Sequence, residues 1–156
     1  MGSRERDILS RLKTVCSSID GTGSYNYDFS DTDAVLIGHE PATVAPRAPG
    51  VYIYPGPLGS SRKPQRTPLN SFSRLFKVQL DVWVPRTAGT AENACLAIVD
   101  AQSDVMRALE NDPELNGLVH DLEIDAQTYD GDAIQLQGYG VVTLLVKIEY
   151  NEKRGQ

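Results

Sequence analysis

The chain has 156 residues, of which 40% are hydrophobic and 23% are charged, and a formal net charge of −6. This length favours one domain, residues 1–156, with a buried core. The negative charge argues against broad, sequence-independent DNA binding, because such binding needs a basic surface. No apolar run reaches the roughly 20 residues of a membrane span, and no apolar signal segment follows the charged N-terminus. We therefore expect synthesis in the cytoplasm and no membrane contact.

The N-terminal segment, residues 3–18, is a predicted helix that ends before Gly21-Thr22-Gly23. Its apolar residues recur at intervals of three and four, which places them on one helical face. They are Ile8, Leu9, Leu12, Val15, Cys16 and Ile19. Beyond the helix, residues 25–29 alternate as a strand would, and residues 34–37 are a short apolar run of either type. No periodicity assigns residues 30–50.

Two predicted strands flank a basic segment in the middle of the chain. Val51 to Tyr54 are β-branched or aromatic, which favours a strand, and Pro55-Gly56-Pro57 is expected to end it. Residues 58–71 are predicted to form a long loop or the tip of a long hairpin, with no acid and three bases, Arg62, Lys63 and Arg66. Residues 74–84 alternate between apolar and more polar types, which predicts a strand with one buried face. Trp83 lies on its more polar face.

Residues 91–110 form the second predicted helix, with Thr90 as a candidate N-cap. Its apolar stripe includes one polar residue, Gln102. The other members are Cys95, Ile98, Val99, Val105, Met106 and Leu109. Because Cys16 and Cys95 both fall on apolar stripes, we expect two buried, reduced thiols.

Two more strands are predicted over residues 118–128 and 141–150, with a turn at residues 130–132 between them and a frayed tail at 151–156. In the first strand, one face carries Asp121, Glu123 and Asp125, and the other carries His120, Leu122, Ile124 and Ala126. The order of elements predicts an α+β fold. Its two helices pack on one face of a mostly antiparallel sheet of about four or five strands, with a long basic loop or hairpin tip.

Motifs that would indicate catalysis or metal binding are missing from the sequence. His39-Glu40 begins like a zinc-protease helix, but Thr43 stands where the second histidine is needed and Pro41 disfavours a helix. There is no Cys-x-x-Cys, no phosphate loop and no Gly-x-Ser-x-Gly elbow. We therefore expect no catalytic residue, cofactor or metal. The acidic triplet is either a solvated sheet face or a functional acidic surface, since a straight strand does not wrap around a calcium ion.

Charge is unevenly distributed along the chain. Residues 100–132 contain ten acids and one base, a net charge of −9, whereas residues 58–71 carry +3. The basic segment is either a solvated loop or an arm that reaches an acidic neighbouring subunit, and such ion pairs select partners more than they add affinity. Trp83 either faces a partner or is covered by the basic segment.

Several segments together resemble the tail terminator and tail-completion proteins of long-tailed bacteriophages. They are the Ile8-Leu9-x-x-Leu12 helix, the Val51–Tyr54 strand, the Phe76–Val84 strand followed by the Ala91-Glu92-Asn93-Ala94 helix, and the closing strand from Gly140 to Tyr150. The resemblance implies a homo-oligomeric ring, usually a hexamer, in the tail or neck of the virion. Such a ring caps the tail tube protein, stops tube elongation and offers a surface to the head–tail connector. DNA passes through the lumen without specific binding, and the family has no active site or cofactor.

Two hypotheses about residues follow. Arg62, Lys63 and Arg66, with Trp83, are expected to contact the next subunit or the tube, and Asp121, Glu123 and Asp125 are expected on the lumen wall. One alternative function is another phage neck protein, for head completion or head–tail joining. A second is a small ligand-binding or hydrolytic α+β domain, which would need a concave polar pocket.

Overall fold

The computed structural model describes residues 3–38, 49–63, 71–85, 91–129 and 139–153, which form two helices and one five-stranded sheet. The elements in chain order are α1 (Arg4–Ser17), β1 (Val35–Ile37), β2 (Gly50–Lys63), β3 (Ser71–Pro85), α2 (Ala91–Glu110), β4 (Asp121–Tyr129) and β5 (Tyr139–Lys153). Neighbouring strands follow the order β1-β2-β3-β5-β4. All pairs are antiparallel except β1 with β2, which is parallel. The α+β prediction is therefore confirmed.

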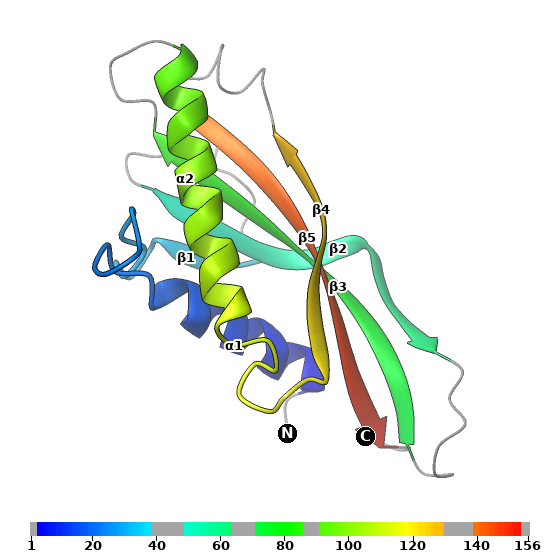
Figure 1. The fold of residues 1–156 in the computed structure, drawn as a ribbon. Coiled ribbons are helices and arrows are strands. Elements are labelled where there is room, and N and C mark those ends of the chain that lie inside the picture. The colour runs from blue at the N-terminus through cyan, green and yellow to red at the C-terminus, as the bar shows by residue number, and fades with distance from the viewer. Residues whose placement is uncertain (1–2, 39–48, 64–70, 86–90, 130–138, 154–156) are drawn as a thin grey trace.

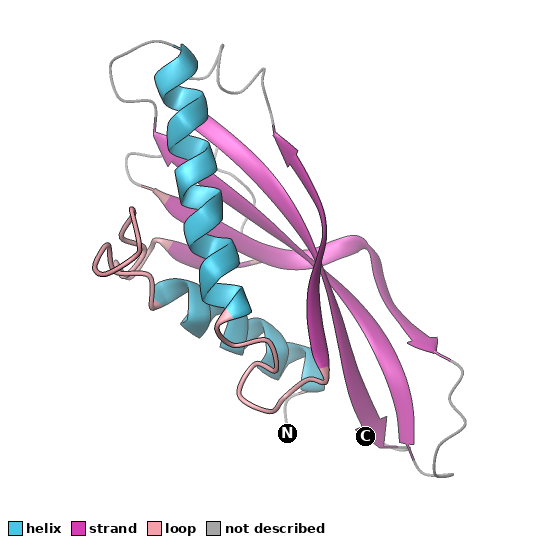
Figure 2. Cartoon of the chain, viewed as in Figure 1, coloured by secondary structure: helices cyan, strands magenta, loops and turns pink. Residues whose placement is uncertain are grey.

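Both helices cover the same face of the sheet, as Figures 1 and 2 show. Helix α1 packs against β1 and β2, and α2 packs against β3 and β5. The alternating apolar residues predicted for β3 form the centre of this interface and are buried, together with those of β5. They are Phe76, Val78, Leu80, Val82 and Val84 of β3, and Val142, Leu144, Val146, Ile148 and Tyr150 of β5.

Helix α1 forms as its pattern predicts. The Ser3 hydroxyl caps the first turn by accepting a hydrogen bond from the Arg6 backbone N–H, which satisfies one of the free donors at a helix start. The buried stripe is the predicted one, with Leu9 only partly covered. Residues 25–29, by contrast, are not a strand. A single bridge joins Asp20 and Asp28, and each carboxylate accepts bonds from the residue two positions on, as turns do.

Helix α2 has the predicted bounds, but its buried face is rotated from the predicted stripe. Cys95 is exposed and Val99 is 38% exposed, so the expectation that both thiols are buried is wrong for Cys95. Small residues replace them on the buried face, at Ala101 and Ala108. The helix lies close to the sheet at Ile98, since a Cβ on Gly140 of β5 would lie only 3.2 Å from the Ile98 Cβ. Thr90, the predicted N-cap, lies outside the described residues.

Strand β2 continues past Pro55-Gly56-Pro57, so the prediction that these residues end it is wrong. The pairing with β3 shifts register between Pro55 and Ser60 and then resumes as far as Lys63. Among the described residues, β1 borders β2 only up to Ile53, so the later part of β2 is an edge strand, where proline is tolerated. Of the two predicted forms of residues 58–71, a long hairpin is correct, and only residues 64–70 of that segment lie outside the described part.

Strand β4 begins at Asp121, three residues later than predicted, and contains a bulge. Ile124 pairs with Val146 and Ala126 with the next residue along, Leu145, so the alternation shifts by one. Gln127 and Tyr129 consequently fall on the helix-covered face, and the Tyr129 hydroxyl donates a hydrogen bond to Gln102 of α2. The predicted single alternation from His120 to Ala126 is therefore interrupted. The predicted turn at 130–132 lies outside the described residues.

Candidate interaction surfaces

The ends of three strands project past the helices at one end of the molecule (Figure 1). We call this part the arm and define it as residues 60–63 of β2, 71–75 of β3 and 149–153 of β5. Its pairing is regular: Lys63 pairs with Ser73, Ser73 with Asn151, and Ser71 with Lys153. The prediction of a frayed tail over residues 151–156 is therefore wrong for residues 151–153, because β5 extends to Lys153.

The arm brings together basic residues that are far apart in the sequence. Arg62 and Lys63 end β2 and Lys153 ends β5, whereas the predicted Arg66 lies outside the described residues. A fourth base, Arg74, is neutralised, since its Nη1 lies 2.6 Å from Glu152 Oε2. The sequence analysis did not include Lys153, because Asn151-Glu152-Lys153 is polar and shows no apolar alternation. These three residues are nevertheless part of a strand, because they pair with β3.

A contact between the first helix and the last strand holds the root of the arm. The Tyr150 hydroxyl donates a hydrogen bond of 3.1 Å to Glu5 Oε1 in the first turn of α1. Burial of the ring raises the pKa of Tyr150, and the Glu5 charge raises it further. The neutral phenol is therefore the form that the folded protein favours.

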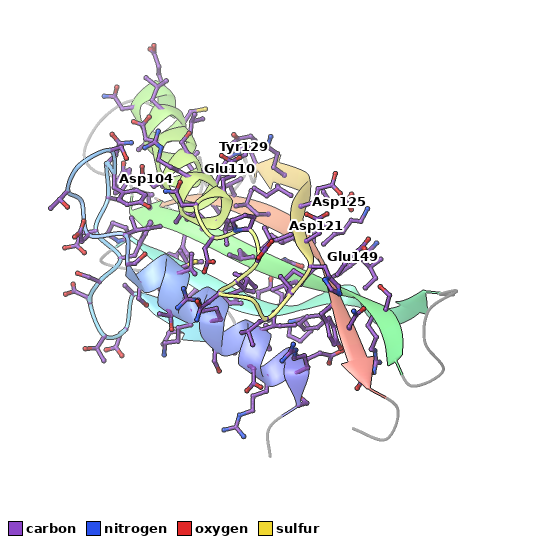
Figure 3. The ribbon with its side chains drawn as sticks, turned by 60° about the horizontal axis from the view of Figure 1, so that its bottom comes forward. Asp104, Glu110, Asp121, Asp125, Tyr129 and Glu149 are labelled. Atoms are coloured by element: carbon purple, nitrogen blue, oxygen red, sulfur yellow. The ribbon has the colours of Figure 1, made fainter. Side chains whose placement is uncertain are left out.

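The predicted acidic triplet lies on the face of the sheet opposite the helices. Asp121 and Asp125 lie on β4 away from α2, with Glu149 of β5 beside them, whereas Tyr129 lies near α2 (Figure 3). Side chains of Glu123 and Asp125 are 65% and 41% exposed. We call Asp121, Glu123 and Asp125 the acidic strip. Asp121 pairs directly with Glu149, which places two like charges opposite each other.

One base lies within the acidic strip. Lys147 Nζ is 4.0 Å from Glu123 Oε2 and 3.8 Å from Asp125 Oδ1. Lys147 also pairs across the sheet with Lys77 of β3. A single ammonium group between two carboxylates leaves the strip net negative. Its position on an exposed face agrees with a surface role, and the lumen hypothesis stays a prediction.

Not all acids of residues 100–132 contribute to a surface. Asp104 of α2 is fully buried, where it accepts hydrogen bonds of 2.8 Å from the backbone N–H groups of Asn26 and Tyr27. Asp112 accepts two bonds from Arg11, at 3.1 and 2.9 Å, and thereby ties α1 to the segment after α2. These two carboxylates are structural, and no sequence pattern separates them from the exposed acids.

Trp83 is largely hidden in the isolated chain. It is 5% exposed, and its ring lies 4.9 Å from that of Tyr52, tilted by 44°. Gly50 pairs with Trp83 in the sheet and lies close to Ala34, where a Cβ would be 2.9 Å from the Ala34 carbonyl oxygen. Little of the indole is open to a partner without rearrangement, and the proposed interface role of Trp83 stays a prediction.

Beside Trp83 is a polar cluster that the sequence analysis missed. Asp81 of β3 is buried and accepts hydrogen bonds from the Tyr54 hydroxyl at 2.5 Å, the Thr143 hydroxyl at 2.8 Å and the Gln79 amide at 3.1 Å. These donors come from β2, β5 and β3. A carboxylate with three donors is well satisfied, so this cluster joins the three central strands. Asp81 falls on the more polar face of the predicted strand, so its burial depends on neighbours from other strands.

The two cysteines differ in chemistry as well as in exposure. Burial raises the pKa of the Cys16 thiol to about 12, whereas Cys95 lies exposed on α2. Within the described residues, no group of three or more His, Cys, Asp or Glu side chains is placed to hold a metal ion. No helix in the described ranges is long and apolar enough to cross a bilayer.

A scan against protein-family models found no match, and a search of curated proteins found none either.

Proposed function

We propose that the chain is a structural virion protein that assembles into a ring, caps a phage tail tube, stops its elongation and provides the surface for head joining. Support comes from the resemblance of its segments to tail terminator and tail-completion proteins. The observation that carries the proposal is the presence of two separate surfaces of opposite charge on one chain, the arm and the acidic strip. A cyclic ring needs two different patches that meet head to tail.

The layout of the sheet also supports assembly. Helices cover one face of the sheet, whereas Glu123 and Asp125 are exposed on the other face, and among the described residues no strand borders the later part of β2. Long strands that run past the helical layer are suited to contact a neighbour, because their backbone and side chains are supported by the sheet. The tube protein and the head–tail connector are the proposed partners above and below the ring, with DNA passing through it.

Electron microscopy of particles made without this protein tests the proposal. We expect abnormally long tails, or tails that are not joined to heads, and we expect restoration by the wild-type chain supplied in trans. Particles of normal tail length and normal joining would contradict the proposal. Purification of the protein with heads rather than with tail tubes would favour the neck-protein alternative, and a monomer with a bound small molecule would favour a ligand-binding domain.

A further inference from the structure

We propose that Asn116 is a site of spontaneous modification, at which water converts the side-chain amide to aspartate and isoaspartate through a cyclic imide. The inference goes beyond the proposed function and does not depend on it. Asn116 is followed by Gly117, and this is the one Asn-Gly pair in the chain. Asparagine is a thermolabile residue, and a glycine after it leaves the attacking backbone nitrogen without a neighbouring Cβ.

The reaction takes place between the two residues of this pair. The Gly117 backbone nitrogen loses its proton to hydroxide and forms a bond to Cγ of Asn116, and the Nδ2 group leaves as ammonia. Water then opens the imide ring at one of its carbonyl carbons. Opening at Cγ gives aspartate, whereas opening at the backbone carbonyl carbon of Asn116 gives isoaspartate, in which the main chain runs through Cβ and Cγ. The overall change consumes water and releases ammonia.

The first observation is that the Gly117 nitrogen is open to attack. Both residues of the pair are exposed and, apart from the adjoining residues, no described atom lies within 4 Å of the position of a Cβ on Gly117. Asn116 donates its own backbone N–H to Asp112 Oδ1 at 2.9 Å. Among the residues that the structure describes, by contrast, none accepts a hydrogen bond from the Gly117 N–H. Hydroxide from the solvent can therefore reach this N–H and remove its proton.

The second observation is the turn that contains the pair. The Leu118 N–H donates a hydrogen bond of 3.3 Å to the Leu115 carbonyl oxygen, with Asn116 and Gly117 between them. The φ angles of the pair are +57° and +80°, a left-handed conformation that asparagine and glycine tolerate best. Ring closure requires rotation about the Cα–C bond of Asn116. A long hydrogen bond at the surface restrains this rotation weakly, so the pair can reach the geometry of the imide.

The other asparagines that the structure describes lack these features. Asn26 is followed by a tyrosine, and its Nδ2 donates a hydrogen bond of 3.0 Å to Asp104 Oδ1. Asn93 and Asn151 lie in regular elements, α2 and β5, and Asn111 directly follows α2. Each of these four residues precedes a residue that has a Cβ. Sequence and structure together therefore single out Asn116.

Modification would alter the connection between α2 and β4. Asp112 ties this connection to α1, because its carboxylate accepts two hydrogen bonds from Arg11. Aspartate at position 116 would add a negative charge close to Asp112, and isoaspartate would also lengthen the main chain inside the turn. We therefore expect the aged protein to lose the hydrogen bond of the Leu118 amide that closes the turn.

The test follows the full-length protein during incubation at neutral and mildly alkaline pH. Cleavage after glutamate releases residues 115–123, in which Asn116 is the one side-chain amide. Mass spectrometry measures the conversion of this amide to an acid, and labelling by an isoaspartyl methyltransferase detects isoaspartate in the same peptide. Asn111 is the internal reference, since it lies exposed in the same connection. The Gly117→Ala variant places a Cβ beside the attacking nitrogen.

We expect Asn116 of the folded wild-type protein to convert roughly tenfold faster than Asn111 or more, and Gly117→Ala to remove this difference, because a Cβ hinders ring closure. The rate should rise with pH, since the attacking nitrogen must lose its proton. Hydrogen exchange of the Leu118 amide should accelerate as the wild-type protein ages. The Asn116→Gly variant, which tolerates a positive φ and has no amide, should age without this acceleration.

Three results would overturn the inference. One is an Asn116 amide that persists in the folded protein but is converted in the chain unfolded by urea, because the turn would then protect the pair. Another is an equal rate of conversion at Asn116 and Asn111. The third is conversion to aspartate without isoaspartate, which would exclude the cyclic imide. All three are measured on the wild-type chain, so they decide the question even if Gly117→Ala, strained at a φ of +80°, does not fold.

Discussion

The hydroxyl of Tyr150, on the last strand, donates a hydrogen bond to the carboxylate of Glu5, in the first turn of α1. This contact joins residues that are 145 positions apart and lies at the root of the arm. Tyr150 is itself almost completely buried. The orientation of the arm relative to the helices therefore depends on this pair, together with the neighbouring Arg74–Glu152 ion pair.

Replacing Tyr150 with phenylalanine should lower the free energy of unfolding by about 1 kcal/mol, the usual net value of a hydrogen bond. The ring would still fill its place in the core, so the fold should be kept. Urea unfolding followed by circular dichroism measures the change. Glu5→Gln retains an acceptor and should cost less. A Tyr150→Phe protein as stable as the wild type would show that the bond contributes nothing.

Stability should fall as the pH rises above about 9. In the folded chain, burial raises the pKa of Cys16 from 9.0 to about 12, and the pKa of Tyr150 is raised from 10.0. A raised pKa in the folded state gives stability that is complete below the unfolded pKa and is lost as the pH increases towards the folded value. This expectation is tested by measuring the free energy of unfolding between about pH 8 and pH 11, a range that spans the pKa values of both groups in the unfolded chain.

Two variants test the contributions of Cys16 and Tyr150 to this pH dependence, to which Tyr27 and Tyr52, whose pKa values burial also raises, contribute as well. Cys16→Ala should flatten the decline that starts near pH 9, although it also lowers stability at every pH by leaving a small cavity. Tyr150→Phe should flatten the decline that starts near pH 10. If neither variant changes the slope against pH, the two groups do not titrate differently in the folded and unfolded states.

Thiol reagents should modify one cysteine in the native protein and two in the unfolded protein. Cys95 is exposed on α2, whereas Cys16 is buried and its thiolate is disfavoured by its raised pKa. Labelling with a chromogenic disulfide at neutral pH, followed by peptide mass analysis, identifies the residue. Cys95→Ser should abolish the native reaction. Rapid labelling of Cys16 in the native protein would contradict the assigned burial.

Removing the carboxylate of Asp104 should destabilise the segment between α1 and β1. Asp104→Ala would leave the part-buried N–H groups of Asn26 and Tyr27 without their acceptor, at a cost of about 1 kcal/mol for each lost hydrogen bond. Asp104→Asn keeps one oxygen and should cost less, and the exposed Asp100→Ala is the control. Hydrogen exchange of the two amides should accelerate in Asp104→Ala, and unchanged exchange would show that other acceptors satisfy them.

Elements with a single uniform periodicity were predictable from the sequence, and local interruptions were not. The stripe of α1 and the alternation of β3 gave both the element and its buried face. In α2, Ala101 and Ala108 carry almost no hydrophobic signal, yet both lie on the buried face. In β4, the bulge after Ile124 depends on the pairing with β5, and the local sequence of β4 does not indicate that pairing.

The interaction surfaces were predictable in part for a similar reason. Arg62 and Lys63 stood out because they lie in a stretch without acids, and the triplet on β4 stood out by its spacing. Lys153 joins them only through the register of β3 with β5. The burial of Trp83 and the hydrogen bonds that the Asp81 carboxylate accepts likewise depend on neighbours from other strands, which are distant in sequence.

The position of β5 between β3 and β4 has a consequence for synthesis on the ribosome. Ser71 pairs with Lys153 and Pro85 with Tyr139, so β3 gains this neighbour only after α2 and β4 have been translated. Contacts this far apart in sequence slow folding, because a long loop must close before they form. A nascent chain that stops before β5 would lack both the strand that holds β4 in the sheet and one edge of the arm. Entry into an assembly would then be restricted to molecules whose translation has passed β5.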